Sequence, residues 1–324
     1  MARYEFTSVF ADEIKKYVVD RKAAGYSENG NRSYLIQFDR FCNEHGIVSP
    51  VFTVSDASAW LEQRESESYT THYSRINASK HFLTYLSIKG YDVYVVRDVK
   101  YKGTDFQPHI YTDSEVQRYF AAVDAHYSAS NRKDALQYPV LFRILYCCGT
   151  RINVTLGIKK EDVDLEKGIL KLNESKNDKQ RYVVCSEDLR KLLNIYANRC
   201  FYLLNDDDYI FTNANGSRLD EKSVYENHRD FLRKAGIPYV GDGKGPRIHD
   251  WRHHMAVYSF KQMTDSGLDM YVALPILSAY LGHKTIFATE KYVRLTLQLF
   301  PYIEEKFRGM AERIFGGGDS NEEH

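Results

Sequence analysis

Apolar residues in the first hundred positions recur at the three- and four-residue spacing of helices that bury one face. Four such stripes predict a small helical unit over residues 1–98. Ser55 and Asp56, residue types that favour helix N-termini, precede the third stripe, and Gly90 ends the fourth. The stripes are Val9, Phe10, Ile14, Tyr17 and Val18; Leu35, Phe38 and Phe41; Trp60 and Leu61; and Tyr73, Ile76, Phe82, Leu83 and Leu86.

The periodicity disappears over residues 99–110, which contain Gly103 and Pro108, and we interpret this segment as an interdomain linker. The second unit, residues 111–324, begins with a helix that Thr112 and Glu115 open at capping-box spacing. GILKLNE and RYVVCS have the character of two strands joined by the polar turn SKNDKQ. The predicted fold is therefore mainly α-helical with a small antiparallel sheet. Its further helices are expected at residues 134–148, 186–204, 223–235 and 249–263, before 281 and over 301–315, with a disordered tail.

Composition narrows the function only slightly. The 324 residues include 44 basic and 44 acidic side chains, so nucleic-acid binding would depend on a local basic surface. The five cysteines form no CxxC pair, and we find neither a signal peptide nor an apolar run long enough for a membrane. These features predict a cytoplasmic protein with reduced thiols and no membrane partner.

Five residues suited to metal-free phosphodiester chemistry stand in one ordered series. Arg151 ends CGTR, His249 and Arg252 bound HDWR, and LGHKTIFATEKY contains His283 and Tyr292. Arginine grips phosphate through parallel hydrogen bonds, and His249 lies one helical turn from Arg252. Tyr292 is the candidate nucleophile, which neighbouring cations or a base would activate.

Each of these residues has a simpler interpretation when it is taken alone. Lys176 in the hairpin turn could protonate a leaving oxygen, but Lys179 shares that turn and both could be ordinary solvated lysines. His249 and His253 have the spacing of metal ligands in HExxH, yet Asp250 replaces the glutamate of that motif and no third ligand is evident. We therefore expect neither a metal nor a cofactor, because the ordered series outweighs the separate interpretations.

Together these motifs resemble those of the tyrosine recombinases, or phage-type integrases. CGTRINVTLGIKKEDVDL is similar to the first arginine box of that family, and SKNDKQRYVV to the hairpin that carries its catalytic lysine. HDWRHHMA is similar to the His-x-x-Arg box and LGHKTIFATEKYVRLT to the closing box with the nucleophile. Residues 1–98 resemble the helical core-binding domain, which with the catalytic domain forms a C-shaped clamp around DNA in the family.

The resemblance implies a role for each matched residue at the scissile phosphate. Arg151 and Arg252 would hold the phosphate, and His283 would donate a hydrogen bond to one of its oxygens. Lys176 would protonate the departing 5′ oxygen.

At the nucleophile, the resemblance implies that His249 assists proton transfer and that Tyr292 forms a 3′-phosphotyrosine. A 5′-hydroxyl of the partner strand would then reverse the bond without ATP. The partners implied are double-stranded DNA with specific sites and a homotetramer that passes through a Holliday junction.

Two features qualify the resemblance. Many family members carry an acidic residue where this chain has Val154, and the neighbouring Asn153 is expected to point elsewhere. The predicted tail helix over 301–315 would dock either on a neighbouring protomer, as such helices often do in the family, or on its own domain. Its apolar stripe is Ile303, Phe307, Met310 and Ile314.

The biological role is less defined than the chemistry. A core-like helix already begins at residue 9, which favours recombinases without a separate arm-binding domain. The closing box favours a mobile-element recombinase for integration, excision or transposition. There are three alternatives: chromosome-dimer resolution, DNA relaxation as by a type IB topoisomerase, and DNA binding without catalysis.

Overall fold

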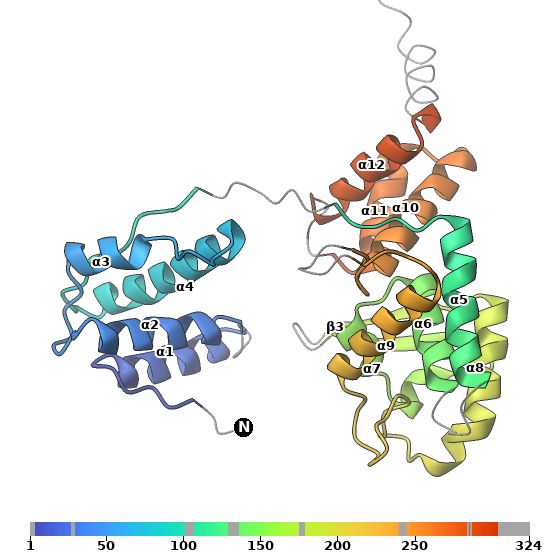
Figure 1. The fold of residues 1–324 in the computed structure, drawn as a ribbon, viewed down its shortest axis with the longest axis horizontal. Coiled ribbons are helices and arrows are strands. Elements are labelled where there is room, and N and C mark those ends of the chain that lie inside the picture. Colours follow the sequence, from blue (N-terminus) through green and yellow to red (C-terminus); the bar gives the residue numbers. More distant parts are fainter. Residues whose placement is uncertain are drawn as a thin grey trace, which may run out of the picture. The chain divides into compact units, whose positions relative to one another are not determined.

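The computed structural model describes residues 4–26, 30–100, 107–128, 136–174, 179–239, 245–283, 285 and 287–303, with only the backbone described at 174, 179, 287 and 288. The chain divides into two units, Met1–Phe106 and Gln107–His324 (Figure 1). This division lies within the segment predicted as a linker. Among the described residues, no helix is both long and apolar enough to cross a membrane.

The first unit packs its helices around an aromatic core. The ring of Phe38 lies within 5.3–6.1 Å, centroid to centroid, of the rings of Phe10, Phe52, Trp60 and Phe82. The four predicted stripes therefore meet in one cluster, because each contributes side chains to it. The helices are α1 (Ala11–Ala23), α2 (Arg32–Glu44), α3 (Val54–Leu61) and α4 (Tyr69–Ile88).

Helix α3 begins earlier than its predicted capping residues suggested. Thr53 is the N-cap: its hydroxyl accepts from the Asp56 amide at 3.2 Å, and the Asp56 carboxylate accepts from the Thr53 amide at 2.8 Å. Ser55 thus lies inside the helix, so its prediction as a cap was wrong. The reciprocal pair satisfies two amides that a cap at Ser55 would leave exposed.

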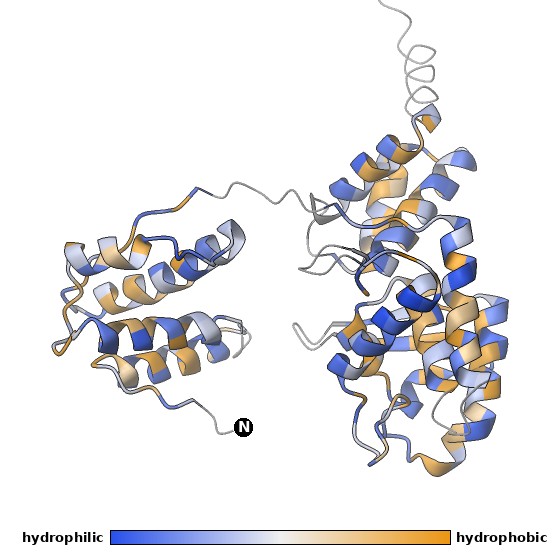
Figure 2. Cartoon of the chain, viewed as in Figure 1, coloured by the Kyte–Doolittle hydropathy of each residue, from blue (hydrophilic) through white to orange (hydrophobic). Residues whose placement is uncertain are grey.

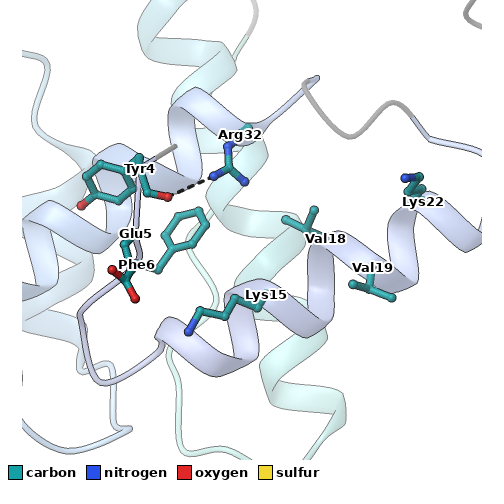
Figure 3. A pocket seen from close by; sticks show the side chains of 8 residues that line it. All are labelled: Tyr4, Glu5, Phe6, Lys15, Val18, Val19, Lys22 and Arg32. Atoms are coloured by element: carbon teal, nitrogen blue, oxygen red, sulfur yellow. Dashed lines mark hydrogen bonds between the residues drawn. The ribbon is translucent and has the colours of Figure 1, made fainter. Parts of the chain in front are cut away.

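A surface pocket of the first unit lies beside residues 4–6 and helices α1 and α2 (Figure 3). Arg32 donates to the Tyr4 carbonyl at 3.1 Å, which ties the N-terminal segment to α2. Lys15 and Lys22 also line it. The pocket contains none of the residues predicted to carry chemistry.

The second unit packs one face of a small sheet against helices, which confirms the predicted fold class. The sheet is antiparallel in the order β1-β2-β3. Hydrophobic and hydrophilic residues alternate along its helices (Figure 2), and the buried apolar side chains form one large cluster. The elements are α5 (Asp113–Ser128), α6 (Gln137–Cys148), α7 (Ile152–Leu156), β1 (Val163–Asp164), β2 (Ile169–Glu174), β3 (Lys179–Val184), α8 (Glu187–Cys200), α9 (Glu221–Lys234), α10 (Asp250–Asp265), α11 (Met270–Leu281) and α12 (Phe287–Leu299), with 3-10 turns at Lys160–Asp162 and Phe201–Leu203.

The hairpin differs from its prediction at the turn. Strand β3 begins at Lys179, which pairs with Glu174 of β2, so Lys179 lies in a strand rather than in the turn. Each added pair satisfies backbone hydrogen-bonding groups, which favours extension of the ladder. Lys176 lies outside the described residues, as do residues 304–324 with most of the predicted tail helix.

Helices α6 and α10 form the buried centre of the unit. Trp251 of α10 is fully buried and stacks on Tyr111, with ring centroids 3.8 Å apart. Thr112 and Glu115 form the predicted capping box at the start of α5, through bonds of 2.8 and 3.2 Å. Since α10 is buried, the segments packed against it occupy defined positions around Arg252.

Gly149 ends helix α6 two residues before Arg151, the first arginine of the predicted series. Its φ of 57° lies in the left-handed region, and a Cβ there would stand 2.0 Å from Met255 Cε. Both features favour glycine, because an L side chain would be strained and would displace a packed methionine.

We predict that Gly149→Ala lowers the free energy of unfolding by more than the roughly 1–2 kcal/mol expected from the left-handed backbone alone. Gly236→Ala is the matched control, because Gly236 follows α9 with a φ of 65° and a Cβ there would meet nothing within 4 Å. Denaturant titration of both variants measures the difference. Equal losses of unfolding free energy in the two variants would show that Met255 does not restrict the residue at position 149.

Three buried histidines make the second unit sensitive to acid. Burial lowers the pKa of His228 to about 3, of His253 to about 2 and of His254 to about 4. Below pH 6.5 the unfolded chain therefore binds protons that the folded chain does not, so stability falls as pH decreases.

We predict that each buried histidine costs about 2 kcal/mol of stability at pH 5 relative to neutral pH, as an upper estimate. Urea titrations at pH 7 and pH 5 test the effect, and His254→Gln should make the pH dependence shallower by one proton. Equal stability at the two pH values would contradict the burial of neutral imidazoles.

Candidate active site

The Arg252 guanidinium joins three segments of the second unit. Its side chain, 1% exposed, donates to the Gly149 carbonyl at 2.7 Å and to the Leu281 carbonyl at 2.6 Å. It also donates to His283 Nε2 at 3.1 Å. Burial lowers its pKa to about 10, which leaves the group charged at neutral pH. Its described partners are neutral, so they do not cancel its positive charge.

Arg151 is placed by the turn that follows Gly149. It is the N-cap residue of α7, and its carbonyl accepts from the Thr155 hydroxyl at 3.1 Å. The Thr150 and Thr155 hydroxyls lie 2.5 Å apart and brace the same turn. Burial and then nearby cations, Arg151 among them, lower the pKa of His283 to about 4. The positive charges of Arg151 and Arg252 therefore both act on the His283 ring.

His249 precedes the first residue of α10 and is exposed to solvent. The surrounding protein and then the charges of Arg252, Lys291 and Arg151 lower its pKa to about 4. At neutral pH the ring is consequently uncharged and can accept a proton. Its edge meets the ring of His253, with centroids 4.9 Å apart.

Tyr292 of α12 lies between two imidazoles. Its ring is 5.4 Å from that of His253 and 6.0 Å from the nearly parallel ring of His283, centroid to centroid. The side chain is only 1% exposed, and burial raises its pKa while the charges of Arg252 and Arg151 act in the opposite direction. The hydroxyl is therefore protonated at neutral pH and needs a base.

His283 follows α11, which ends at Gly282 in the left-handed conformation with φ 66°. Its Nε2 meets Arg252 and its Nδ1 lies 2.7 Å from the Thr289 hydroxyl. The structure thus brings together Arg151, His249, Arg252, His283 and Tyr292, which come from three separate segments of the sequence. Lys176, the sixth predicted residue, lies outside the described residues, and so does the side chain of Lys179.

Asn153 points away from this cluster, as predicted. Its side-chain amide donates to the Glu221 carboxylate at 2.8 Å, and its backbone carbonyl accepts from the Arg218 guanidinium at 2.7 Å. Val154, at the position where many family members are acidic, is a half-buried residue of α7 packed against the main core. Val154 therefore contributes packing but no hydrogen bond to either arginine.

Two cations near the cluster were missed by the sequence analysis. Arg181 of β3 donates to the Tyr280 carbonyl, next to the Leu281 carbonyl that Arg252 binds. The Lys291 ammonium lies 5.1 Å from the centre of the Tyr292 ring. Both residues were visible in the sequence, but strand register and helix orientation determine where they point.

The histidine pair offers little to a metal ion. His249 and His253 meet edge to face, and no three His, Cys, Asp or Glu side chains in the described part of the chain are arranged to hold a metal. His254 packs instead against Tyr146 and Tyr258, with centroids 5.4 and 4.4 Å apart. His254 therefore has a packing role in the core of the second unit.

Comparison with known proteins links this site to one family. Residues 111–298, which are 188 of the 324, match the phage integrase family. The chain is 26% identical over 296 residues to y4rB of Sinorhizobium fredii, a protein named as an integrase/recombinase, covering 88% of this chain and 93% of that protein. It is 24% identical over 311 residues to the tyrosine recombinase XerA of Pyrococcus furiosus, covering 95% and 97% of the two chains.

A solved structure has the same fold. A lambda integrase tetramer bound to a Holliday junction superposes with a TM-score of 0.62 at 14% identity, covering 87% of this chain and 76% of that chain. Residues 111–298, the range that matches the family, include all the residues of the cluster around Arg252. The chain belongs to the phage integrase family and is a tyrosine recombinase.

Proposed function

We propose that this recombinase cleaves and rejoins DNA at specific sites through a 3′-phosphotyrosine at Tyr292. The observation that carries the proposal is the convergence of Arg151, Arg252 and His283 on the buried Tyr292, with His249 close to both arginines. Two guanidiniums supply positive charge to a phosphate, and neutral imidazoles can move protons. The chemistry then requires neither a metal nor a cofactor.

In the proposed cleavage step, the Tyr292 oxygen forms a bond to phosphorus and the bond to the 5′ oxygen breaks. His249 accepts the phenolic proton, directly or through water, and a hairpin lysine protonates the departing oxygen. Arg151 and Arg252 hold the non-bridging oxygens throughout. A 5′-hydroxyl of another strand then attacks the phosphotyrosine and restores the phosphodiester.

The burial of Tyr292 adds a requirement to this step. The side chains of Tyr292 and Arg252 are each only 1% exposed, so neither can contact a DNA phosphate in this conformation. Cleavage therefore needs a local rearrangement that opens access to the hydroxyl. Such a requirement would prevent the protein from cleaving DNA that is not yet correctly bound.

We propose a role in the integration, excision or transposition of a mobile element. The support is the closing-box resemblance and the likeness to y4rB, which is named as an integrase/recombinase. Chromosome-dimer resolution is the alternative that the likeness to XerA keeps open. Both roles place the protein in the cytoplasm with DNA.

We also propose that the active form is a tetramer on DNA, linked by the segment after Ile303 of each neighbouring copy. The solved lambda integrase assembly is a tetramer on a Holliday junction. A docking face is available on α11, where apolar residues at helical spacing are exposed: Val272 and Ile276 are each 49% exposed. Pro275 and Ala279 continue that face.

Our first prediction for this function concerns the nucleophile. Nicked duplexes, from which the cleaved end diffuses away, should trap a covalent protein–DNA adduct that persists in denaturant. Tyr292→Phe should form none, because it lacks the attacking oxygen while it keeps the ring. An adduct with the Phe variant would show that another residue attacks.

The second prediction separates the two hairpin lysines. Replacing the bridging 5′ oxygen with sulfur creates a leaving group that needs little protonation. Lys176→Ala should be slow on the oxygen substrate and rescued on the sulfur substrate, whereas Lys179→Ala should be nearly normal on both. The reverse pattern would assign the general acid to Lys179.

The third prediction concerns assembly. Val272→Glu with Ile276→Glu should prevent tetramers on DNA, because two carboxylates would be desolvated by a docked neighbour. Ile195→Glu, at a residue of α8 that is 48% exposed, is the matched control and should leave assembly unchanged. Analytical ultracentrifugation of the DNA complexes gives the readout. Normal tetramers in the double variant would show that α11 is not part of the interface. Relaxation of supercoiled DNA by a demonstrable monomer would instead favour a topoisomerase-like activity.

A further inference from the structure

Thr289 is a fully buried hydroxyl that connects the candidate nucleophile helix to His283. It lies on α12 one turn before Tyr292, and its Oγ1 is 2.7 Å from His283 Nδ1. The other ring nitrogen of His283, Nε2, lies 3.1 Å from the Arg252 guanidinium. Both nitrogens of His283 therefore have partners, one on each side.

The chemistry of these partners determines the direction of both bonds. A guanidinium can only donate, so Nε2 must accept from Arg252 and carries no proton. A neutral imidazole has one N–H, which must then be on Nδ1 and donate to the Thr289 hydroxyl. The surroundings favour the neutral ring, because burial and then the charges of Arg252, Arg151, Lys291 and Arg181 all oppose its protonation.

We propose that Thr289 is a positioning residue that fixes the Nδ1–H tautomer and the orientation of His283, so that Nε2 faces the phosphate-binding side of the site. In this structure Nε2 accepts from Arg252. After it takes up one proton from solvent, the same nitrogen can donate to a phosphate oxygen while the bond from Nδ1 to Thr289 is kept. The ring need not rotate, but the Arg252 N–H must move away from Nε2, because a protonated Nε2 and a guanidinium are both donors.

A hydroxyl suits this task better than the alternatives. A carboxylate at this position would pull the ring towards the charged form permanently, whereas an apolar side chain would leave Nδ1–H buried without an acceptor. Thr289→Val preserves the branched shape and removes only the oxygen. Thr289→Ser keeps the oxygen and removes a methyl group, so the pair of variants separates hydrogen bonding from packing.

Nitrogen NMR of the DNA-free protein, labelled with ¹⁵N in histidine, reads the tautomer directly. His283→Gln serves only to assign the His283 signals. The wild type and Thr289→Ser should show His283 mainly as Nδ1–H, and Thr289→Val should lose that preference. An unchanged tautomer in the Val variant would overturn the proposal, and Thr289→Ala provides the same readout if the Val variant does not fold.

The catalytic consequence rests on the proposed function and is measured separately. Thr289→Val should slow adduct formation about tenfold, as expected for one lost hydrogen bond, while Thr289→Ser stays near the wild-type rate. In a His283→Gln background, Thr289→Val should have no further effect. Equal slowing by the Ser and Val variants would overturn the catalytic role. A wild type that forms no adduct would reject the proposed function, and the NMR result would still decide the tautomer.

Discussion

The buried charge of Arg252 is the constraint on which the rest of this site depends. A guanidinium out of contact with water must satisfy its donors within the protein, and here it binds the Gly149 and Leu281 carbonyls and His283 Nε2. These contacts hold the end of α6 and the end of α11 against α10. Because the described partners are neutral, the positive charge is retained where a phosphate would gain most from it. One side chain thus both assembles the site and supplies its electrostatic potential.

The same concentration of positive charge explains the state of the histidines. The surrounding protein and then the neighbouring cations lower the pKa of His249 and of His283 to about 4. Neutral imidazoles can accept protons or bind the arginines without adding to the repulsion. The arriving DNA phosphate would add negative charge and favour protonation of these rings. We therefore expect the protonation of these two rings to change when DNA binds.

Much of this arrangement could be predicted because residue types and helix periodicity determine it locally. The capping box of Thr112 and Glu115 and the end of α6 at Gly149 depend on neighbouring residues. The ordered arginines, histidines and tyrosine led to the chemistry that we propose. Features that depend on register or tertiary direction were not predictable: the start of β3 at Lys179, the approach of Arg181 to α11, and the contact between Thr289 and His283. The cap of α3 was misplaced because Thr53 and Ser55 are both good capping residues, and only the observed bonds distinguish them.

The most direct test of the account is to locate the covalent bond to DNA. The trapped complex would be digested with protease and nuclease, and the residue that carries the remaining nucleotide would be identified by mass spectrometry. The account predicts a nucleotide attached through its 3′ phosphate to Tyr292, one of 26 tyrosines in the chain. A nucleotide on a different residue, or one attached through its 5′ phosphate, would contradict it.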